Sequence, residues 1–277
     1  MITPENTLIC IFSYNMGATL QLCLTSVNDM CPRFRVAVFD DNSEDPETLA
    51  VIDKTRPQLY AAMSNKSPKE GRRHGNLYRN IQAMMDFAFD KGFTYLFLLQ
   101  DDMQFVRPFS ADVRRQYADI FADESVIQID PRFLRFSTGY EVEPGMRGYR
   151  HGPDTAYADV GIVDLPRLRR LGWRMTEGER ENQQELAALG KKRIFPFTPI
   201  AMHVPFPKLF RAGKRRIRLF PFNRGKYCFH YMTDAEMKAM DVRPIEQPPY
   251  FRAFLKPMNM RLTRLIYVLR KDSKIFT

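Results

Sequence analysis

A short apolar segment that ends in two adjacent carboxylates constrains the fold of this chain more than any other feature. Residues 96–102 read Leu-Phe-Leu-Leu-Gln-Asp-Asp. A continuous apolar run of this length is typical of a strand that is buried on both faces, as in a parallel sheet. The two acids at its end would then lie at the carboxyl edge of the sheet, where open α/β folds bind ligands.

Asp101 and Asp102 place like charges side by side, and such charges repel each other unless a cation holds them. In proteins Mg²⁺ is usually bound by one or two carboxylates together with phosphate oxygens of a substrate. The pair therefore indicates a divalent metal site. Taken alone, the two residues fit a helix N-cap or a solvated turn equally well, because Asp is common at both.

Strand-like and helix-like segments alternate through the first hundred residues. This order predicts right-handed crossovers and a mostly parallel sheet that is covered by helices. After Asp102 the pattern loosens, with a further helix expected over 109–122 and a strand over 125–129. In the first part the expected strands are 7–12, 34–39, 58–63 and 94–99, and the expected helices are 17–30, 46–54 and 76–91.

Polar residues follow several of these segments where a strand ends or a helix begins. Because the carboxyl ends of parallel strands meet at one edge of a sheet, we expect their side chains to converge. Several such sets together are hard to explain as turns. They are Ser13, Tyr14 and Asn15 after the first strand, Asp40 and Asp41 after the second, Arg79 and Asn80 early in the helix that follows, and Gln100, Asp101 and Asp102 after the fourth strand.

In this combination the chain resembles the nucleotide-sugar-binding half of the inverting family 2 glycosyltransferases, over residues 7–205. Members of that family carry a Tyr-Asn pair, an Asp-Asp-Gly/Asn-Ser turn, an Arg-Asn pair and a D-x-D acid pair in this order. The resemblance implies a GT-A-type fold, an α/β, Rossmann-like architecture with a mostly parallel sheet flanked by helices. Gln100 stands in place of the first acid. The roles of the D-x-D acids would therefore fall to Asp101 and Asp102.

The resemblance also implies how a nucleotide-sugar donor would be held. Asp102 would ligate Mn²⁺ or Mg²⁺, and Asp101 would contact the ribose or the metal. Asp41 would accept a hydrogen bond from a ring N–H of uracil or thymine, because a carboxylate is a strong acceptor. The other expected contacts are Ser13, Tyr14, Asn15 and Asp40 in the nucleotide pocket, Arg79 on phosphate, and His203 on the metal or diphosphate. A surface ion pair for Arg79 and a purely structural role for His203 are the alternatives.

An inverting transfer needs a base that deprotonates the acceptor hydroxyl, and the family supplies it near the start of a later helix. Here Thr176 and Glu179 form a capping-box pattern for a helix over 177–189. Glu181 and Glu179 are the candidate bases. Glu181 is slightly favoured, because Glu181-Asn182 looks more like the family's Glu-Asp pair. The alternative is that the acids at this helix start only complement the helix dipole.

The chain carries a net charge of +10, and eight cations without an acid lie within residues 208–226. Such a cluster can bind nucleic acid, anionic lipid or a phosphorylated substrate, or form a solvated loop. Residues 254–271 place apolar residues at helical spacing between cations, as in a helix on a membrane surface or one packed on the core. We expect two halves of one domain, 1–105 and 106–207, and a basic extension over 208–277.

These features predict a metal-dependent glycosyltransferase that uses a UDP- or dTDP-linked sugar and a glycan or lipid-linked acceptor, in bacterial surface polysaccharide synthesis. No nucleic acid partner is expected. The lack of a basic signal-like start, of an apolar run of about 18 residues and of paired cysteines favours a cytoplasmic protein. The basic stretch over 208–226 and the C-terminal helix would then lie near the inner face of the membrane. A nucleotidyltransferase and a nucleotide-sugar-binding module without turnover are the alternatives.

Overall fold

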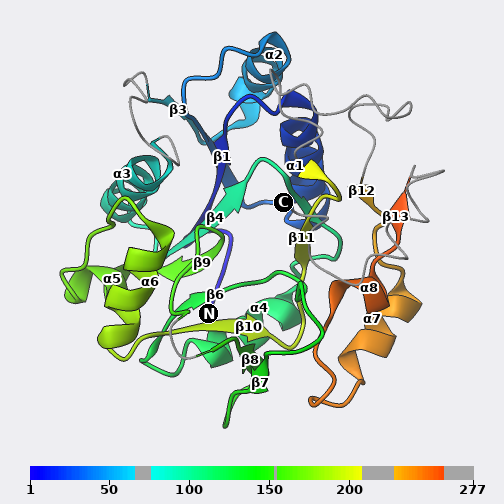
Figure 1. The fold of residues 1–277 in the computed structure, drawn as a ribbon. Coiled ribbons are helices and arrows are strands. Elements are labelled where there is room, and N and C mark those ends of the chain that lie inside the picture. The colour runs from blue at the N-terminus through cyan, green and yellow to red at the C-terminus, as the bar shows by residue number, and fades with distance from the viewer. Residues whose placement is uncertain (66–75, 153–154, 208–227, 259–277) are drawn as a thin grey trace.

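The computed structural model describes residues 1–65, 76–152, 155–207 and 228–258, with a nine-stranded sheet at its centre (Figure 1). The order is β3-β2-β1-β4-β9-β6-β10-β8-β7. Strands β1 to β4 are parallel, β9 is antiparallel to both β4 and β6, and β10 is parallel to β6. The strands are β1 (Thr7–Ser13), β2 (Arg35–Asp40), β3 (Ala61–Ser64), β4 (Tyr95–Gln100), β6 (Val126–Ile129), β7 (Glu141–Val142), β8 (Gly148–Arg150), β9 (Gly161–Asp164) and β10 (Lys192–Pro196).

The mostly parallel α/β sheet expected from the sequence is confirmed. Strand β4 is buried from Tyr95 to Leu99, as its continuous apolar run predicts. The reversed direction of β9 is not evident from the sequence, because its four residues are all buried and show no alternation. Gly161 is required in this strand: it has φ +136°, and an added Cβ would lie 2.6 Å from the carbonyl oxygen of Ile129.

Helices cover both faces of the sheet because alternate residues of its strands point in opposite directions. Ile9 and Ile11 pack in one apolar cluster with α1, α2 and α4, whereas Leu8 and Cys10 pack in a second cluster with α3, α5 and α6 (Figure 1). None of the described helices is long and apolar enough to cross a membrane. The helices are α1 (Gly17–Met30), α2 (Pro46–Thr55), α3 (Leu77–Asp90), α4 (Ala111–Ile120), α5 (Leu165–Arg170), α6 (Glu179–Ala188), α7 (Asp234–Asp241) and α8 (Phe251–Phe254), with a 3₁₀ turn at Arg56–Gln58.

Local sequence patterns predict one helix start correctly and another incorrectly. Helix α2 begins as expected, with Pro46 in its first turn and the Asp45 carboxylate accepting from the N–H of Thr48 at 3.0 Å. The capping box expected for α6 is wrong. Its N-cap is Gly178, and the N–H of Thr176 instead donates to Oδ1 of Asn182 at 2.8 Å.

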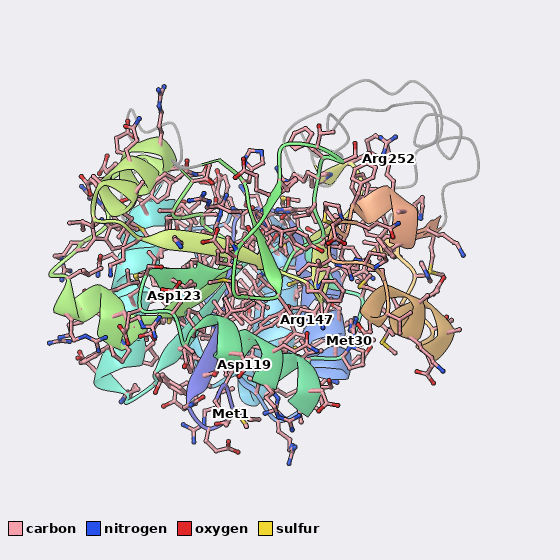
Figure 2. All side chains as sticks on the ribbon, turned by 90° about the horizontal axis from the view of Figure 1, so that it is seen from below. Met1, Met30, Asp119, Asp123, Arg147 and Arg252 are labelled. Atoms are coloured by element: carbon pink, nitrogen blue, oxygen red, sulfur yellow. The ribbon has the colours of Figure 1, made fainter. Side chains whose placement is uncertain are left out.

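Residues 228–258 pack on the sheet domain in an apolar cluster that contains Met16, at the start of α1, as well as Phe133 and Met202. They include α7, α8 and the ribbon of β12 (Cys228–Phe229) and β13 (Pro257–Met258). This segment lies at the opposite end of the molecule from α5 and α6 in both views (Figures 1 and 2). It holds four cations and four acids, so the described part of the expected extension is not basic. Residues 208–226 lie outside the described residues, and so do residues 259–271 of the helix expected over 254–271. The first residues of that expected helix are not helical, because α8 ends at Phe254 and Pro257–Met258 form a strand.

Arg107 joins α7 to the sheet domain. Its Nη1 and Nη2 donate to the two carboxylate oxygens of Asp241 at 2.8 and 2.7 Å, and its side chain is 7% exposed. We expect Arg107→Met to lower the free energy of unfolding in urea by about 1–3 kcal/mol, because the charge-assisted pair is lost. Arg115→Met, which removes an exposed pair with Asp112, should change it by less than about 0.5 kcal/mol. Equal losses in the two variants would contradict this account.

Candidate active site

Strands β1, β2 and β4 end together at one edge of the sheet. The register pairs Ser13 with Asp40. Backbone hydrogen bonds continue past the strand ends: the N–H of Asp41 donates to the carbonyl of Ser13 at 2.9 Å, and that of Asp101 donates to the carbonyl of Phe12 at 3.0 Å. The sheet therefore brings both acid pairs to the place that the sequence predicts.

Asn15 and Asp40 hold the turns after β1 and β2 together. Asn15 has φ +53°, and its side-chain oxygen accepts from the N–H groups of Glu44 and Asp45 at 2.8 and 3.0 Å. Its own N–H donates to the hydroxyl of Ser43, which donates to Asp40 at 2.6 Å. Both side chains thus hold the two turns in place, and their contact with a donor stays a prediction.

Tyr14 and Asp101 join the first and fourth strands. The N–H of Tyr14 donates to Oδ2 of Asp101 at 2.8 Å, and the carboxylate of Asp101 is thereby fixed at the end of β1. The ring of Tyr14 reaches the surface, with 37% of the residue exposed. The hydroxyl of Ser13 is buried and has no hydrogen-bond partner among the described residues.

Asn80, rather than Arg79, contacts the acid pair after β2. Its side-chain amide donates to Oδ1 of Asp41 at 3.1 Å. Arg79 lies on the exposed side of α3, with Nη2 3.2 Å from Oε1 of Glu177. Helical spacing predicts that Asn80 is buried and Arg79 exposed, because Asn80 lies one turn before the buried Met84 and so shares its face. A contact of Arg79 with phosphate stays a prediction.

The two neighbours on α3 allow a matched test. We expect Asn80→Ala to lower the free energy of unfolding by about 1–3 kcal/mol, because a buried hydrogen bond to the Asp41 carboxylate is lost. Arg79→Ala removes only a half-exposed ion pair and should cost less than about 1 kcal/mol. Urea denaturation of both variants measures this. An Arg79→Ala loss equal to that of Asn80→Ala would overturn the assignment.

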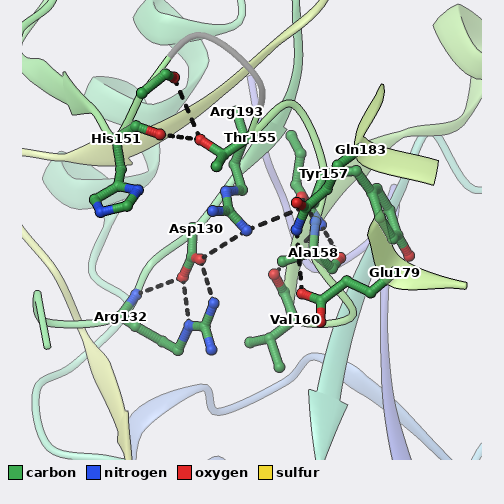
Figure 3. A network of polar contacts seen from close by, with 12 residues as sticks. Asp130, Arg132, His151, Thr155, Tyr157, Ala158, Val160, Glu179, Gln183 and Arg193 are labelled. Atoms are coloured by element: carbon green, nitrogen blue, oxygen red, sulfur yellow. Dashed lines mark hydrogen bonds and ion pairs between the residues drawn. The ribbon is translucent and has the colours of Figure 1, made fainter. Parts of the chain in front are cut away.

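His203 lies directly beside Asp102, because β11 (Ala201–His203) pairs with β5 (Met103–Phe105) and sets His203 opposite Met103. Nδ1 of His203 is 2.9 Å from Oδ1 of Asp102, and Nε2 is 2.9 Å from Nη1 of Arg132. Arg132 in turn binds the buried Asp130 through two hydrogen bonds of 2.7 and 2.5 Å (Figure 3).

The protonation of His203 follows from these partners. A guanidinium only donates, so Nε2 accepts from Arg132 and Nδ1–H donates to Asp102. Burial lowers the pKa of His203 below its usual value despite the opposing effect of Asp102, so the ring is neutral. In this arrangement His203 orients the carboxylate of Asp102, and a metal at Nε2 would have to displace Arg132.

The acids after β4 fit a divalent cation that a diphosphate helps to hold. No group of three His, Cys, Asp or Glu side chains within the described ranges forms a metal cage by itself. Mg²⁺ does not require one, since one or two carboxylates and substrate phosphates suffice. Asp102, oriented by His203, and the adjacent Asp101 provide carboxylate oxygens of this kind.

A cavity of about 310 Å³ opens next to these acids. Gln100 and His203 belong to its wall, which joins it to the Asp101–Asp102 turn. On the wall Nε2 of Gln100 donates to Oδ2 of Asp159 at 2.5 Å. The position that lacks the family's first acid is thus used to bind another acid. The remaining lining residues are Arg132, Phe133, Arg135, Phe136, Tyr140, His151, Glu179, Arg193 and Phe195.

Of the two candidate bases, Glu179 lines this cavity and Glu181 does not. Burial raises the pKa of Glu179 above its usual value, and the like charge of Asp159 raises it further. Glu181 is exposed and folds back over the N-cap of α6, where a Cβ added to Gly178 would lie 1.7 Å from its Oε2. The side chain of Glu181 therefore lies where an acid complements the start of a helix.

Comparisons with known proteins find similar folds among solved structures. No family model and no curated protein matches the chain. The fold resembles that of S. aureus TarS. A structure of TarS 1-349 gives a TM-score of 0.51 at 14% identity over 72% of this chain, and one of TarS 1-349 in complex with UDP gives 0.50 at 14% over 74%. This chain spans 60% of the first and 62% of the second.

A more distant likeness links the chain to the mannosyltransferase PcManGT from Pyrobaculum calidifontis, in complex with GDP-Man and Mn²⁺. The TM-score is 0.47 at 15% identity, over 72% of this chain and 57% of that one. The likeness to TarS confirms the α/β fold with a mostly parallel sheet flanked by helices. A likeness at 14% identity shows a shared fold and does not show a shared reaction.

Two acids at this site, Asp159 and Asp130, are not among the site residues predicted from the sequence. Asp159 precedes β9, and the start of an antiparallel strand lies at the same edge as the ends of its parallel neighbours. Its position could be found only by knowing that β9 is reversed. Asp130 directly follows a strand expected at 125–129, so a signal for the Asp130–Arg132 pair was present in the sequence.

Proposed function

We propose that this protein is a GT-A-type glycosyltransferase that moves a sugar from a nucleotide-diphosphate donor to an acceptor hydroxyl. One arrangement carries the proposal: the Asp101–Asp102 turn, which suits a metal and a diphosphate, adjoins a cavity that contains Asp159 and Glu179. A donor site next to half-buried carboxylates suits a transfer to a hydroxyl.

UDP or dTDP is the proposed nucleotide of the donor. Asp41 lies at the end of β2, and a carboxylate there favours a base with a ring N–H donor. Asn80 fixes the Asp41 side chain, and Asp101 lies within reach of the same strand ends. The UDP complex of TarS 1-349, which has a similar fold, supports this choice.

Asp102, with Asp101, would hold Mn²⁺ or Mg²⁺, which neutralises negative charge on the departing diphosphate when it is bound. The chain's own contribution is to orient Asp102 through Nδ1–H of His203. His203 is therefore proposed as a positioning residue, with Arg132 and Asp130 fixing it from the other side. The backbone N–H of Tyr14 does the same for Asp101.

Glu179, rather than Glu181, is the proposed base. It accepts the proton of the acceptor hydroxyl, whose oxygen then forms a bond to the anomeric carbon as the bond to the diphosphate breaks. Attack opposite the leaving group inverts the configuration at that carbon, as in the family 2 enzymes that the sequence resembles. A raised pKa suits Glu179 to this role, because the efficiency of a base is greatest when its pKa is near the working pH.

The proposed acceptor is a glycan or a lipid-linked precursor of a bacterial surface polysaccharide, used by a cytoplasmic enzyme at the inner face of the membrane. The cluster of cations in residues 208–226 supports contact with anionic lipid. Flotation with anionic liposomes tests this last point. A protein that stays in the soluble fraction would remove the membrane from the proposal.

Release of nucleoside diphosphate from a panel of UDP-, dTDP- and GDP-sugars with Mn²⁺ tests the proposed function. We expect turnover with at least one UDP- or dTDP-sugar and loss of turnover when EDTA removes the metal. Tight UDP binding without release from any donor would instead favour a binding module. Pyrophosphate formation from a nucleoside triphosphate and a sugar phosphate would favour a nucleotidyltransferase.

A further inference from the structure

His203 lies between a hydrogen-bond donor and an acceptor, and these two partners fix the position of its ring proton. Nε2 of His203 is 2.9 Å from Nη1 of Arg132, and Nδ1 is 2.9 Å from Oδ1 of Asp102. Because a guanidinium only donates, Nε2 accepts and the proton lies on Nδ1. A ring nitrogen that carries a proton does not ligate a cation. On the side that faces Asp102, His203 is thus a hydrogen-bond donor.

Arg132 is held against His203 by its side chain and by its backbone. Nε and Nη2 of Arg132 donate to the two carboxylate oxygens of Asp130 at 2.7 and 2.5 Å, and Asp130 is fully buried (Figure 3). The backbone of Arg132 forms a parallel bridge with Ala201, the first residue of β11. The next N–H, that of Phe133, donates to the carbonyl of Ala201 at 3.0 Å. The segment that carries Arg132 is therefore paired with the strand that carries His203.

The contact with Arg132 determines which element His203 presents to a cation on Asp102. With the proton on Nδ1, the acids of the turn, Asp101 and Asp102, offer oxygen ligands, which suit Mg²⁺ and Mn²⁺. Without Arg132 the proton can move to Nε2, because His203 lines the cavity and solvent there can accept a hydrogen bond. The lone pair of Nδ1 would then face the cation, and an imidazole nitrogen favours Ni²⁺, Cu²⁺ and Zn²⁺.

We propose that Arg132, held by Asp130, sets the metal preference of the site by keeping the proton of His203 on Nδ1. The imidazole then orients Asp102 and stays out of the coordination of the cation. The inference rests on the proposed function, because it concerns the metal of the donor, and it adds how the chain selects hard cations. If the Asp130–Arg132 pair were only structural, its removal would change stability but not the atoms that the cation contacts.

Pulsed EPR of Mn²⁺ bound together with UDP identifies the contacting atoms directly. In the full wild-type chain we expect coupling to the phosphorus atoms of UDP and no directly bound nitrogen. The double variant Asp130→Asn/Arg132→Met removes both charges of the buried pair, so neither is left without its partner. It should show a directly bound nitrogen, which adding His203→Gln abolishes.

The possible EPR results separate the inference from the proposed function. A nitrogen ligand in the wild-type chain overturns the inference and requires no variant to fold. A double variant that binds Mn²⁺ and UDP without a nitrogen ligand also overturns it. Wild-type protein that gives no UDP-dependent Mn²⁺ signal counts against the proposed function instead.

Calorimetry gives an independent measure of the metal preference. UDP is titrated into protein at saturating Ni²⁺ or Mg²⁺, and the ratio of the two UDP affinities cancels the general effect of the lost charges. We expect Asp130→Asn/Arg132→Met to shift this ratio toward Ni²⁺ by about tenfold or more. The control Asp241→Asn/Arg107→Met removes another Arg–Asp pair, at α7, and should leave the ratio within about threefold of the wild type. An unchanged ratio in the first variant, or equal shifts in both, would overturn the inference.

Discussion

Glu179→Gln should lower the turnover number by about 10²–10⁴-fold, which is the usual contribution of a positioned base. The amide keeps the size of the side chain and its place on α6 but accepts no proton. Glu181→Gln is the matched control, because that side chain lies two residues further along the same helix and outside the cavity. We expect it to stay within about threefold of the wild type in single-turnover assays with saturating donor. A larger loss in Glu181→Gln than in Glu179→Gln would return the base to Glu181.

The pH dependence follows from the same group. Glu179 acts as a base only when it is ionised, so kcat/KM should fall as the pH drops through its pKa. Because burial and Asp159 raise that pKa, the fall should begin at a higher pH than for an ordinary glutamate. Asp159→Asn removes the like charge and should shift the acidic limb to lower pH. A limb that does not move in this variant would contradict the proposed pairing of Asp159 with Glu179.

Asp102→Asn should reduce turnover by about 10³-fold, because a metal contributes several kcal/mol of charge stabilisation to a departing diphosphate. The variant should also lose the Mn²⁺-dependent part of UDP affinity, which calorimetry measures directly. The amide preserves a hydrogen-bond acceptor for Nδ1–H of His203, so the loss is attributable to charge rather than to folding. His203→Gln, which removes the positioning contact, should cost less than Asp102→Asn.

Gln100→Ala is the neighbouring comparison at the position where the family carries an acid. Gln100 contacts Asp159 rather than the acids after it, so it acts on the donor side only indirectly. We expect the turnover number of Gln100→Ala to fall by about tenfold, since one side-chain hydrogen bond is removed. A loss in Gln100→Ala as large as that in Asp102→Asn would mean that Gln100 itself belongs to the metal site.

The donor side of the site is the part that the sequence predicts best. Leu96 to Asp102 indicates a buried strand with acids at its end, and the parallel register of β1, β2 and β4 brings Asp41 and Asp101 to one edge as expected. Local patterns suffice here because strand ends in a parallel sheet share one edge. Asn80 is also predictable, since the helical period sets it on the buried face of α3 and Arg79 on the exposed one.

The acceptor side depends on contacts that no local pattern contains. Asp159 reaches the cavity because β9 is reversed, and Arg193 comes from β10, which β9 and β6 separate from β4 in the sheet order. Glu179 and Glu181 differ by two residues on one helix, and only the packing of α6 decides which of them faces the cavity. The sequence named both candidates and slightly favoured Glu181, whereas the packing sets Glu179 at the cavity.

A crystal structure of the full chain with UDP and Mn²⁺ tests the central claim most directly. We expect the uracil ring beside Asp41, the diphosphate at the end of β4, and Mn²⁺ on Asp102, with the cavity of Glu179 still open for the acceptor. UDP bound away from the carboxyl edge of β1, β2 and β4, or Mn²⁺ bound without Asp102, would contradict it.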